Sequence, residues 1–416
     1  MKVLVLGAGV VGTTASYFLA REGHAVTVVD RRAAPGEETS FANGGQLSAS
    51  GARPWANPDV PRLLLKWLGR PDAPLVFRPR IDPTLWRWTL SFLANCLPSR
   101  ADANTAKVLR LAFFSRNAMA SLIRETALAF DHRQRGILHV FRTQAGFDKA
   151  AEDAREFTRL GLSFDIVERE RIRQIEPALA PTLPRLAGAT FCPDDGFGDA
   201  HMFTVELAKR AVGMGVDFRL STTIREVRAD RDRITGVVTD QGTLDADLYV
   251  VALGSASPLL MKPLGLRLPI VPAKGYSATV PIVNPQAAPS VSVTDEERKI
   301  VITPLGRRLR IAGTAEFAGY DERINERRAK SVLNDGLDLF PDAAAASQAT
   351  LWTGLRPLTP DGAPVLGPTR YRNLLLDTGH GTLGWTLAAG SAQIIAALAS
   401  GKDAGINLAG LTLARF

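Results

Sequence analysis

The sequence predicts an α/β protein of two domains, one built on a parallel, nucleotide-binding sheet and the other on an antiparallel sheet. A glycine-rich strand, turn, helix and strand unit at residues 2–30 predicts the first domain. Segments within residues 268–313 alternate apolar and polar residues between turns, which predicts antiparallel strands for the second. The length of 416 residues exceeds that of one ordinary domain and therefore indicates two cores.

The N-terminal unit carries a GxGxxG spacing directly after a short apolar strand at 3–6. In this motif the first glycine permits a tight turn, the second lets a pyrophosphate approach the backbone, and the third lets the helix pack on the strand. The helix expected at 11–21 directs its free N–H groups and the positive end of its dipole at that phosphate. We therefore expect cofactor contacts from Gly7, Gly9, Val10, Val11 and Gly12.

The second strand of the unit is expected at 26–29 and ends at Asp30. A carboxylate at this place can accept hydrogen bonds from the 2′-OH and 3′-OH of an adenosine ribose. Asp30 thus disfavours a cofactor with a 2′-phosphate, such as NADP. The next residue, Arg31, is also expected at the cofactor site, and its positive charge would favour such a phosphate. A βαβ unit without a nucleotide is the alternative, which the complete order of strand, turn, helix, strand and acid disfavours.

The composition is that of a globular protein, with 46% apolar and 22% charged residues. No signal peptide is evident, and no run of about 20 uncharged apolar residues predicts a spanning helix. Only Cys96 and Cys192 occur, which excludes a disulfide framework, favours the cytoplasm and predicts no metal site. The net charge of +8 suits nucleic acid, an anionic membrane or acidic substrates, and without a nucleic-acid module the membrane surface ranks first.

A segment rich in tryptophan and arginine, residues 58–96, favours peripheral contact with the cytoplasmic face of the inner membrane. Trp67, Trp86 and Trp88 alternate with basic residues, and both kinds of side chain favour the headgroup region of a bilayer. The alternative is that these tryptophans pack a domain core. The basic residues are Arg62, Lys66, Arg70, Arg78, Arg80 and Arg87.

The remaining pattern predicts further elements of both domains. Ile224 lies in a strand pair at 216–226, where a nucleotide-domain strand is expected to pass an adenine, and Gly254 closes an apolar strand at 247–253. Helices are expected at 99–130, 145–160, 204–215 and 326–339, with a short one from 171 that stops at Pro177; strands are expected at 136–142, 234–238, 242–246, 268–280, 290–294, 299–304, 308–313 and 373–377.

Two glycine-rich segments suggest that the nucleotide is a flavin. The loop at 33–50 can bring backbone amides close to a flavin N5 and O4, unless it is a flexible surface turn; its candidates are Asn43, Gly44, Gly45 and Gln46. The turn at 378–384 feeds a helix through residue 398, whose N-terminus suits the negative charge of a reduced flavin near N1 and O2. The candidates in this turn are Gly379, His380, Gly381, Thr382, Leu383 and Gly384.

Motifs along the whole chain extend this interpretation. They read SFANGGQLS, GRPDAP, KGYSATVPI, WTGLRPLTPDGAPVLG and DTGHGTLGW. With them the chain resembles the small-subunit type of bacterial FAD-dependent D-amino-acid dehydrogenases, within the D-amino-acid oxidase and glycine oxidase superfamily. The last two motifs are much more specific than GxGxxG.

The resemblance implies a Rossmann-like FAD-binding domain, 1–50, 195–257 and 351–416, and an interleaved α+β substrate domain on an antiparallel sheet, 51–194 and 258–350. It implies oxidation of D-amino acids to 2-oxo acids and ammonia, with hydride transfer from Cα to flavin N5 and electrons passed to a quinone-type or respiratory-chain acceptor. Arg356 in GLRP matches the arginine that pairs with the substrate carboxylate, and Tyr276 in KGY matches a position near the pocket. We expect FAD to be bound noncovalently.

Two alternatives remain at this stage. One is a flavoenzyme that acts on a cyclic secondary amine, such as D-proline or a hydroxyproline epimer. The other is a flavin-binding protein that has lost catalysis.

Overall fold

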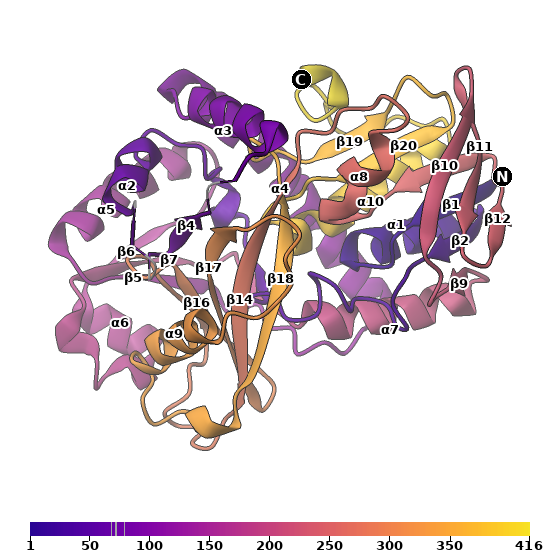
Figure 1. Cartoon of the computed structure of the whole chain (residues 1–416). Helices are drawn as coiled ribbons and strands as arrows, with labels where there is room; N and C mark the ends of the chain where they lie inside the picture. The colour runs from indigo at the N-terminus through magenta and orange to yellow at the C-terminus, as the bar shows by residue number, and fades with distance from the viewer. Residues whose placement is uncertain (68, 71–72, 79) are drawn as a thin grey trace.

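The computed structural model describes residues 1–67, 69–70, 73–78 and 80–416. The chain forms two main sheets, with helices on their faces (Figure 1). The helices are α1 Val10–Arg21, α2 Val60–Trp67, α3 Pro83–Asn95, α4 Pro98–Thr126, α5 Gln144–Arg159, α6 Arg169–Ile175, α7 Ala200–Gly213, α8 Ser257–Met261, α9 Glu326–Leu337 and α10 Gly384–Ala399.

The first sheet has six strands in the order β19-β20-β13-β1-β2-β9. Its strands pair in parallel except β19, which runs antiparallel to β20. The expected nucleotide-binding sheet is confirmed, because β1 and β2 are separated by α1 as the GxGxxG unit requires. The strands are β1 Lys2–Leu6, β2 Ala25–Val29, β9 Asp217–Arg219, β13 Leu248–Val251, β19 Val365–Pro368 and β20 Leu374–Thr378.

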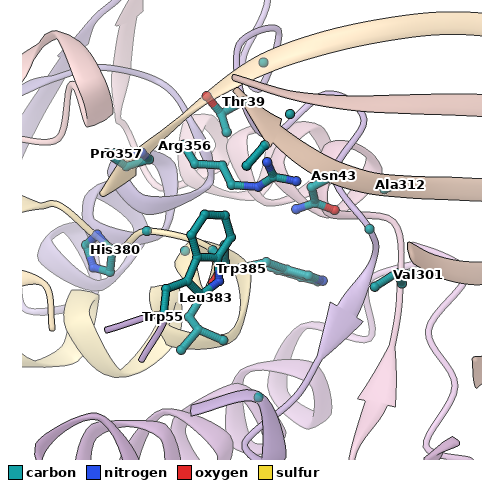
Figure 2. Close-up of a pocket in the computed structure, with 18 of the residues that line it drawn as sticks. Thr39, Asn43, Trp55, Val301, Ala312, Arg356, Pro357, His380, Leu383 and Trp385 are labelled. Carbon is teal, nitrogen blue, oxygen red and sulfur yellow. The ribbon is translucent and has the colours of Figure 1, made fainter. Parts of the chain in front are cut away.

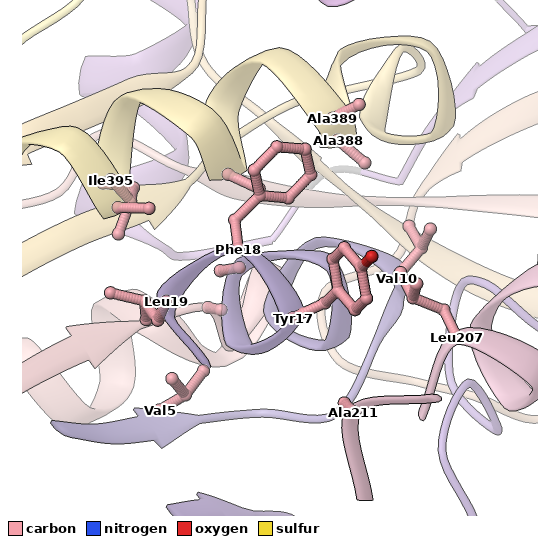
Figure 3. Packing of buried hydrophobic residues seen from close by; sticks show 14 of the residues in the cluster. Val5, Val10, Tyr17, Phe18, Leu19, Leu207, Ala211, Ala388, Ala389 and Ile395 are labelled. Carbon is pink, nitrogen blue, oxygen red and sulfur yellow. The ribbon is translucent and has the colours of Figure 1, made fainter. Parts of the chain in front are cut away.

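The core of this domain forms where α1 meets α7 and α10 (Figure 3). Phe18 and Leu19 of α1 are buried in one cluster with Ala388 and Ile395 of α10. Small residues let α10 approach α1 closely, and Gly390 likewise lets α4 approach, since a Cβ there would lie 2.7 Å from Ser115 Cα. The first turn of α1 is thereby held in place.

The second sheet has nine strands, with β18-β14-β17-β16-β15-β5-β7-β6 in order and β4 paired to β17. It is antiparallel apart from the parallel pairs β15·β5 and β17·β4. Helix α9 packs on one face, in a cluster with Ile311 and Val332. The strands are β4 Leu75–Phe77, β5 Ile137–Phe141, β6 Asp165–Val167, β7 Gly188–Cys192, β14 Val271–Pro281, β15 Ser292–Asp295, β16 Ile300–Leu305, β17 Arg308–Phe317 and β18 Thr350–Leu358.

Smaller units complete the fold. A three-stranded sheet contains β10 Ile224–Asp230, β11 Arg233–Thr239 and β12 Gly242–Leu244, and a short pair joins β3 Gln46–Leu47 to β8 Gly196–Phe197. The expected helix at 99–130 is the single, unbroken α4, which packs against α10.

We propose the two-domain division expected from the sequence with one change at residue 351. Strand β18 pairs with β14 along its whole length, from Thr350 opposite Thr279 to Leu358 opposite Val271. Residues 350–358 therefore belong with the large sheet and not with the nucleotide-binding domain.

The tryptophans of segment 58–96 have different environments. Trp88 is only 4% exposed, and its indole N–H donates to the Leu358 carbonyl oxygen, as the core-packing alternative expected. Trp86 is 47% exposed on the outer face of α3. Trp67 in α2 is half-buried, so Trp86 is the most exposed of the three tryptophans in this segment.

Candidate active site

A cavity of about 1960 Å³ extends from the glycine turn after β1 to strands β14, β17 and β18 of the large sheet. Its volume exceeds the roughly 300–1,000 Å³ of an ordinary ligand pocket, as an extended dinucleotide beside a substrate requires. Figure 2 shows residues from β18, from the loop at Asn43 and from the turn at His380 converging on it.

The glycine turn has the shape of a phosphate cradle. A Cβ on Gly12 would lie 2.0 Å from the Gly7 carbonyl oxygen, so Gly12 permits the close contact between helix and strand. Gly9 differs, because it lines the cavity and, among the described residues, only Ser40 Oγ lies within 4 Å of its ideal Cβ, at 3.6 Å. The N-cap residue of α1, Gly9, has no side chain to cap the helix, and in the described part of the chain Ser40 Oγ accepts only the Val10 N–H, at 3.0 Å. An anion beside Val10 and Val11 would therefore meet the remaining N–H groups of the first turn.

Asp30 lies at the end of β2, where the sequence places it. Its carboxylate accepts the Ala8 N–H at 2.7 Å and the Arg32 N–H at 2.8 Å, and burial raises its pKa. Each oxygen keeps a further lone pair for a ribose hydroxyl. Arg31 lines the cavity but pairs with Glu38 at 2.7 Å, which opposes binding of a 2′-phosphate.

The loop around Asn43 is fixed on the large sheet and is not a flexible surface turn. Thr303 Oγ1 donates to the Gly44 carbonyl oxygen at 2.7 Å, and Gln46 Nε2 donates to Ser292 and Thr294 at 3.0 Å. Asn43, Gly44, Gly45 and Gln46 all line the cavity. Their backbone is therefore available to a flat ring system.

The second glycine-rich turn leads into α10, whose N-cap residue, Leu383, makes no capping bond with its side chain. His380, Gly381, Thr382, Leu383 and Gly384 line the cavity, as do Ile224 and Gly254. Gly379 does not: a Cβ there would lie 2.9 Å from Thr359 Cγ2, so this glycine serves packing.

His380 turns its imidazole into the protein. Its ring is 3% exposed, with Nε2 at 2.9 Å from Ser391 Oγ and 3.4 Å from Asp377 Oδ1. This orientation favours a cofactor contact through the backbone of His380.

Trp385 is a cavity residue that the sequence interpretation missed. Its indole Nε1 is buried and has no hydrogen-bond partner among the described residues. The edge of a flavin ring carries nitrogen and oxygen atoms that accept hydrogen bonds, so this unpaired donor fits such a cofactor. The only sequence indication was its place directly after the glycine turn.

Arg356 is one of several cations that line the cavity. It extends from β18 into the cavity (Figure 2), and its Nη1 donates to the Thr314 carbonyl oxygen at 2.9 Å. In the described part of the chain no carboxylate lies within ion-pairing distance of its guanidinium. Burial lowers its pKa to about 10, so it remains charged at neutral pH and can bind an anion.

Gly275 makes room for Arg356. A Cβ at Gly275 would lie 2.1 Å from Arg356 Nη1. The guanidinium can therefore lie across β14 only because this position has no side chain.

Tyr276 lines the cavity, in keeping with its expected place near the pocket, where it could hydrogen-bond the substrate carboxylate or close the pocket. Its side chain, however, has a partner within the protein. Its ring is 1% exposed and belongs to the cluster beneath α9, and its hydroxyl donates to Glu316 Oε2 at 2.6 Å. Burial, together with the hydrogen bond to the Glu316 carboxylate, raises the pKa of Tyr276, so the hydroxyl stays protonated and donates to Glu316.

A parallel sheet with a glycine turn before α1, and a buried indole donor without a partner among the described residues, indicate a flavin-dependent oxidoreductase. Comparisons with known proteins agree. The family model described as FAD dependent oxidoreductase (DAO) matches residues 2–398, and the chain belongs to this family. It is an FAD-dependent enzyme.

Individual relatives are similar over their full length. A D-amino acid dehydrogenase of Paramagnetospirillum magneticum is 53% identical over 100% of this chain and 99% of its own. One of Dechloromonas aromatica is 49% identical over 97% of each. Glycine oxidase from Geobacillus kaustophilus has a TM-score of 0.79 at 24% identity, covering 100% of this chain and 98% of its own, which shows a shared fold.

Proposed function

We propose that this enzyme oxidises D-amino acids to 2-oxo acids and ammonia. The observation that carries the proposal is Arg356, a half-buried cation without a carboxylate partner among the described residues, on the wall of the FAD cavity. An α-carboxylate is the complementary anion for a guanidinium. The names of the similar dehydrogenases support this substrate class.

The chain's own residues then orient the substrate. Arg356 binds the carboxylate through two parallel N–H groups, which fixes the direction of the Cα–H bond and hence the preferred stereoisomer. Bound FAD supplies the acceptor for the electron pair and hydrogen of that bond. The amine lone pair completes the C=N bond of an imino acid, and water hydrolyses this product to the 2-oxo acid and ammonia.

An anaerobic titration tests the proposal. We expect D-alanine to bleach the flavin band between about 440 and 460 nm, whereas L-alanine leaves it unchanged. Bleaching by D-proline but not by D-alanine would instead assign a cyclic secondary amine as substrate. A flavin spectrum that no amino acid alters would contradict the proposal and favour a flavin-binding protein without this activity.

We further propose that the electrons pass to a quinone-type or respiratory-chain acceptor. We also propose that α3 binds the protein to the cytoplasmic face of an anionic membrane. In the parts of the chain that the structure describes, no helix is long and apolar enough to cross a membrane. The outer face of α3 and its flanks nevertheless exposes Ile81, Trp86, Leu90, Leu93 and Leu97. Together with the net charge of +8, this apolar face suits a surface of anionic lipid.

Charge placed on this face should abolish membrane contact. We expect the double variant Trp86→Glu, Leu90→Glu to bind vesicles of phosphatidylglycerol and phosphatidylethanolamine about tenfold or more weakly than wild type, because two apolar anchors are lost. Flotation at low salt measures the bound fraction. Val212→Glu, at an equally exposed apolar residue of α7, is the matched control and should bind normally. Failure of wild type to bind would remove the membrane proposal.

A further inference from the structure

Thr314, beside Arg356, has an unusual backbone conformation. Its φ is +54°, in the left-handed region that β-branched residues seldom adopt. Glycine or asparagine would adopt this conformation at lower cost. A strained residue of this kind persists where the surrounding structure requires it, often at a binding site.

The conformation belongs to a β-bulge in β17. Lys274 of β14 lies opposite Glu316, whereas Tyr276 lies opposite Gly313, so Thr314 and Ala315 together face the single residue Gly275. Bulges interrupt the hydrogen bonding of a strand and redirect individual groups, and they are common next to active sites. This bulge lies at the edge of the substrate cavity.

The bulge redirects the carbonyl group of Thr314 to Arg356. The Thr314 carbonyl oxygen accepts the Arg356 Nη1–H at 2.9 Å instead of completing the ladder with β14. Because Gly275 leaves the space open, the guanidinium lies against this carbonyl. One residue thus fixes the orientation of the cation.

The side chain of Thr314 has an unused hydroxyl group. Its Oγ1 is buried and lacks a hydrogen-bond partner among the described residues, while Thr314 itself lines the cavity. A buried hydroxyl without a partner is costly, so a partner supplied by a ligand accounts for it. An anion held by Arg356 is a candidate for this partner, because Thr314 and Arg356 line the same cavity and Arg356 already contacts the Thr314 carbonyl oxygen.

We propose that Thr314 is a substrate-binding residue whose hydroxyl donates to the α-carboxylate held by Arg356, while its carbonyl positions the guanidinium. The inference rests on the proposed D-amino-acid substrate and adds a third donor to the carboxylate site. It also explains why a β-branched residue occupies a left-handed position: the bulge requires the backbone conformation, and the substrate requires the hydroxyl.

Variants of the holoenzyme separate the hydroxyl from the backbone. Thr314→Val keeps the shape of the side chain and the backbone strain but loses the hydroxyl. We expect it to raise the Kd of both D-alanine and the carboxylate inhibitor benzoate about 10- to 100-fold. Anaerobic flavin reduction measures the first Kd and flavin absorbance the second. Thr314→Gly relieves the strain and should fold at least as well as wild type with the same loss. Thr314→Ser restores the hydroxyl and should bind within about threefold of wild type.

Two controls make the result decisive. Ser277→Ala removes another buried, unpartnered hydroxyl on the neighbouring strand, outside the cavity lining, and should leave both Kd values unchanged. Discrimination between D-alanine and its amide should fall in Thr314→Val, because the lost bond is specific to the carboxylate. Wild-type affinity in both Thr314→Val and Thr314→Gly would overturn the inference. Absence of any D-amino-acid reaction in wild type would instead overturn the proposed function.

Discussion

Replacing Arg356 by alanine is expected to lower kcat/KM for D-amino acids by about 10²- to 10⁴-fold while the protein keeps its FAD. Two hydrogen bonds to a charged group contribute about 1.5–3 kcal/mol each, and each 1.4 kcal/mol is a factor of ten. The loss falls on the reaction because orientation of Cα–H depends on the same contact. Steady-state kinetics and the flavin absorbance of the purified variant measure the two effects.

The fold should tolerate this change. Arg356 is half-buried, and its one hydrogen bond in the described structure is to the Thr314 carbonyl oxygen, so we expect the unfolding temperature to shift by only a few degrees. Arg356→Lys keeps the charge but not the planar pair of donors and should recover only part of the activity. Full turnover by the alanine variant would disprove the role of Arg356 as carboxylate anchor.

Replacing Gly9 by alanine is expected to weaken FAD binding about 10- to 100-fold without unfolding the protein. In the described part of the chain the added methyl group meets no atom nearer than Ser40 Oγ at 3.6 Å, and the φ of −69° is open to any residue. It would occupy the space where the pyrophosphate approaches the backbone, and overpacking of this kind costs about 1–3 kcal/mol. Reconstitution of apoprotein with FAD, followed by fluorescence, measures the Kd.

Two other glycines complete this test. Gly213 lies at the end of α7, and no atom of the described residues lies within 4 Å of its ideal Cβ, so Gly213→Ala should leave FAD affinity unchanged. Gly12→Ala would place a Cβ 2.0 Å from the Gly7 carbonyl oxygen and should disturb folding itself. Wild-type FAD affinity in Gly9→Ala would contradict the proposed position of the phosphate.

The nucleotide-binding half could be predicted closely because its information is local. Glycines, a helix and an acid within thirty residues dictate one supersecondary unit, and the structure confirms it from β1 to Asp30. The cavity-lining loop at Asn43 and the turn at His380 were likewise found from short glycine-rich motifs. Gly379 of the same turn was also expected to contact the cofactor, but it lacks a side chain because it packs closely against Thr359.

The substrate half was harder to predict because its contacts are long-range. Strand β18 was missed, since a segment with Gly354 and Pro357 has a weak strand pattern, and only pairing with β14 makes it a strand. The hydrogen bond of Tyr276 to Glu316 was not foreseen, because a short motif does not show which partner a strand residue meets. Trp385 was missed because its burial depends on helices far apart in sequence.

The sequence by itself determined the α/β class and the glycine turn of Gly7, Gly9 and Gly12, and the resemblance of its motifs to a known family predicted Arg356 as the carboxylate anchor. Only the tertiary structure decided how that arginine is held, because the bulge at Thr314 and the gap at Gly275 lie on strands distant from Arg356 along the chain. Local backbone preferences can be read from neighbouring residues. The partner of a buried polar group is instead chosen by which strands pair and in which register, and that choice is made by packing over the whole sheet.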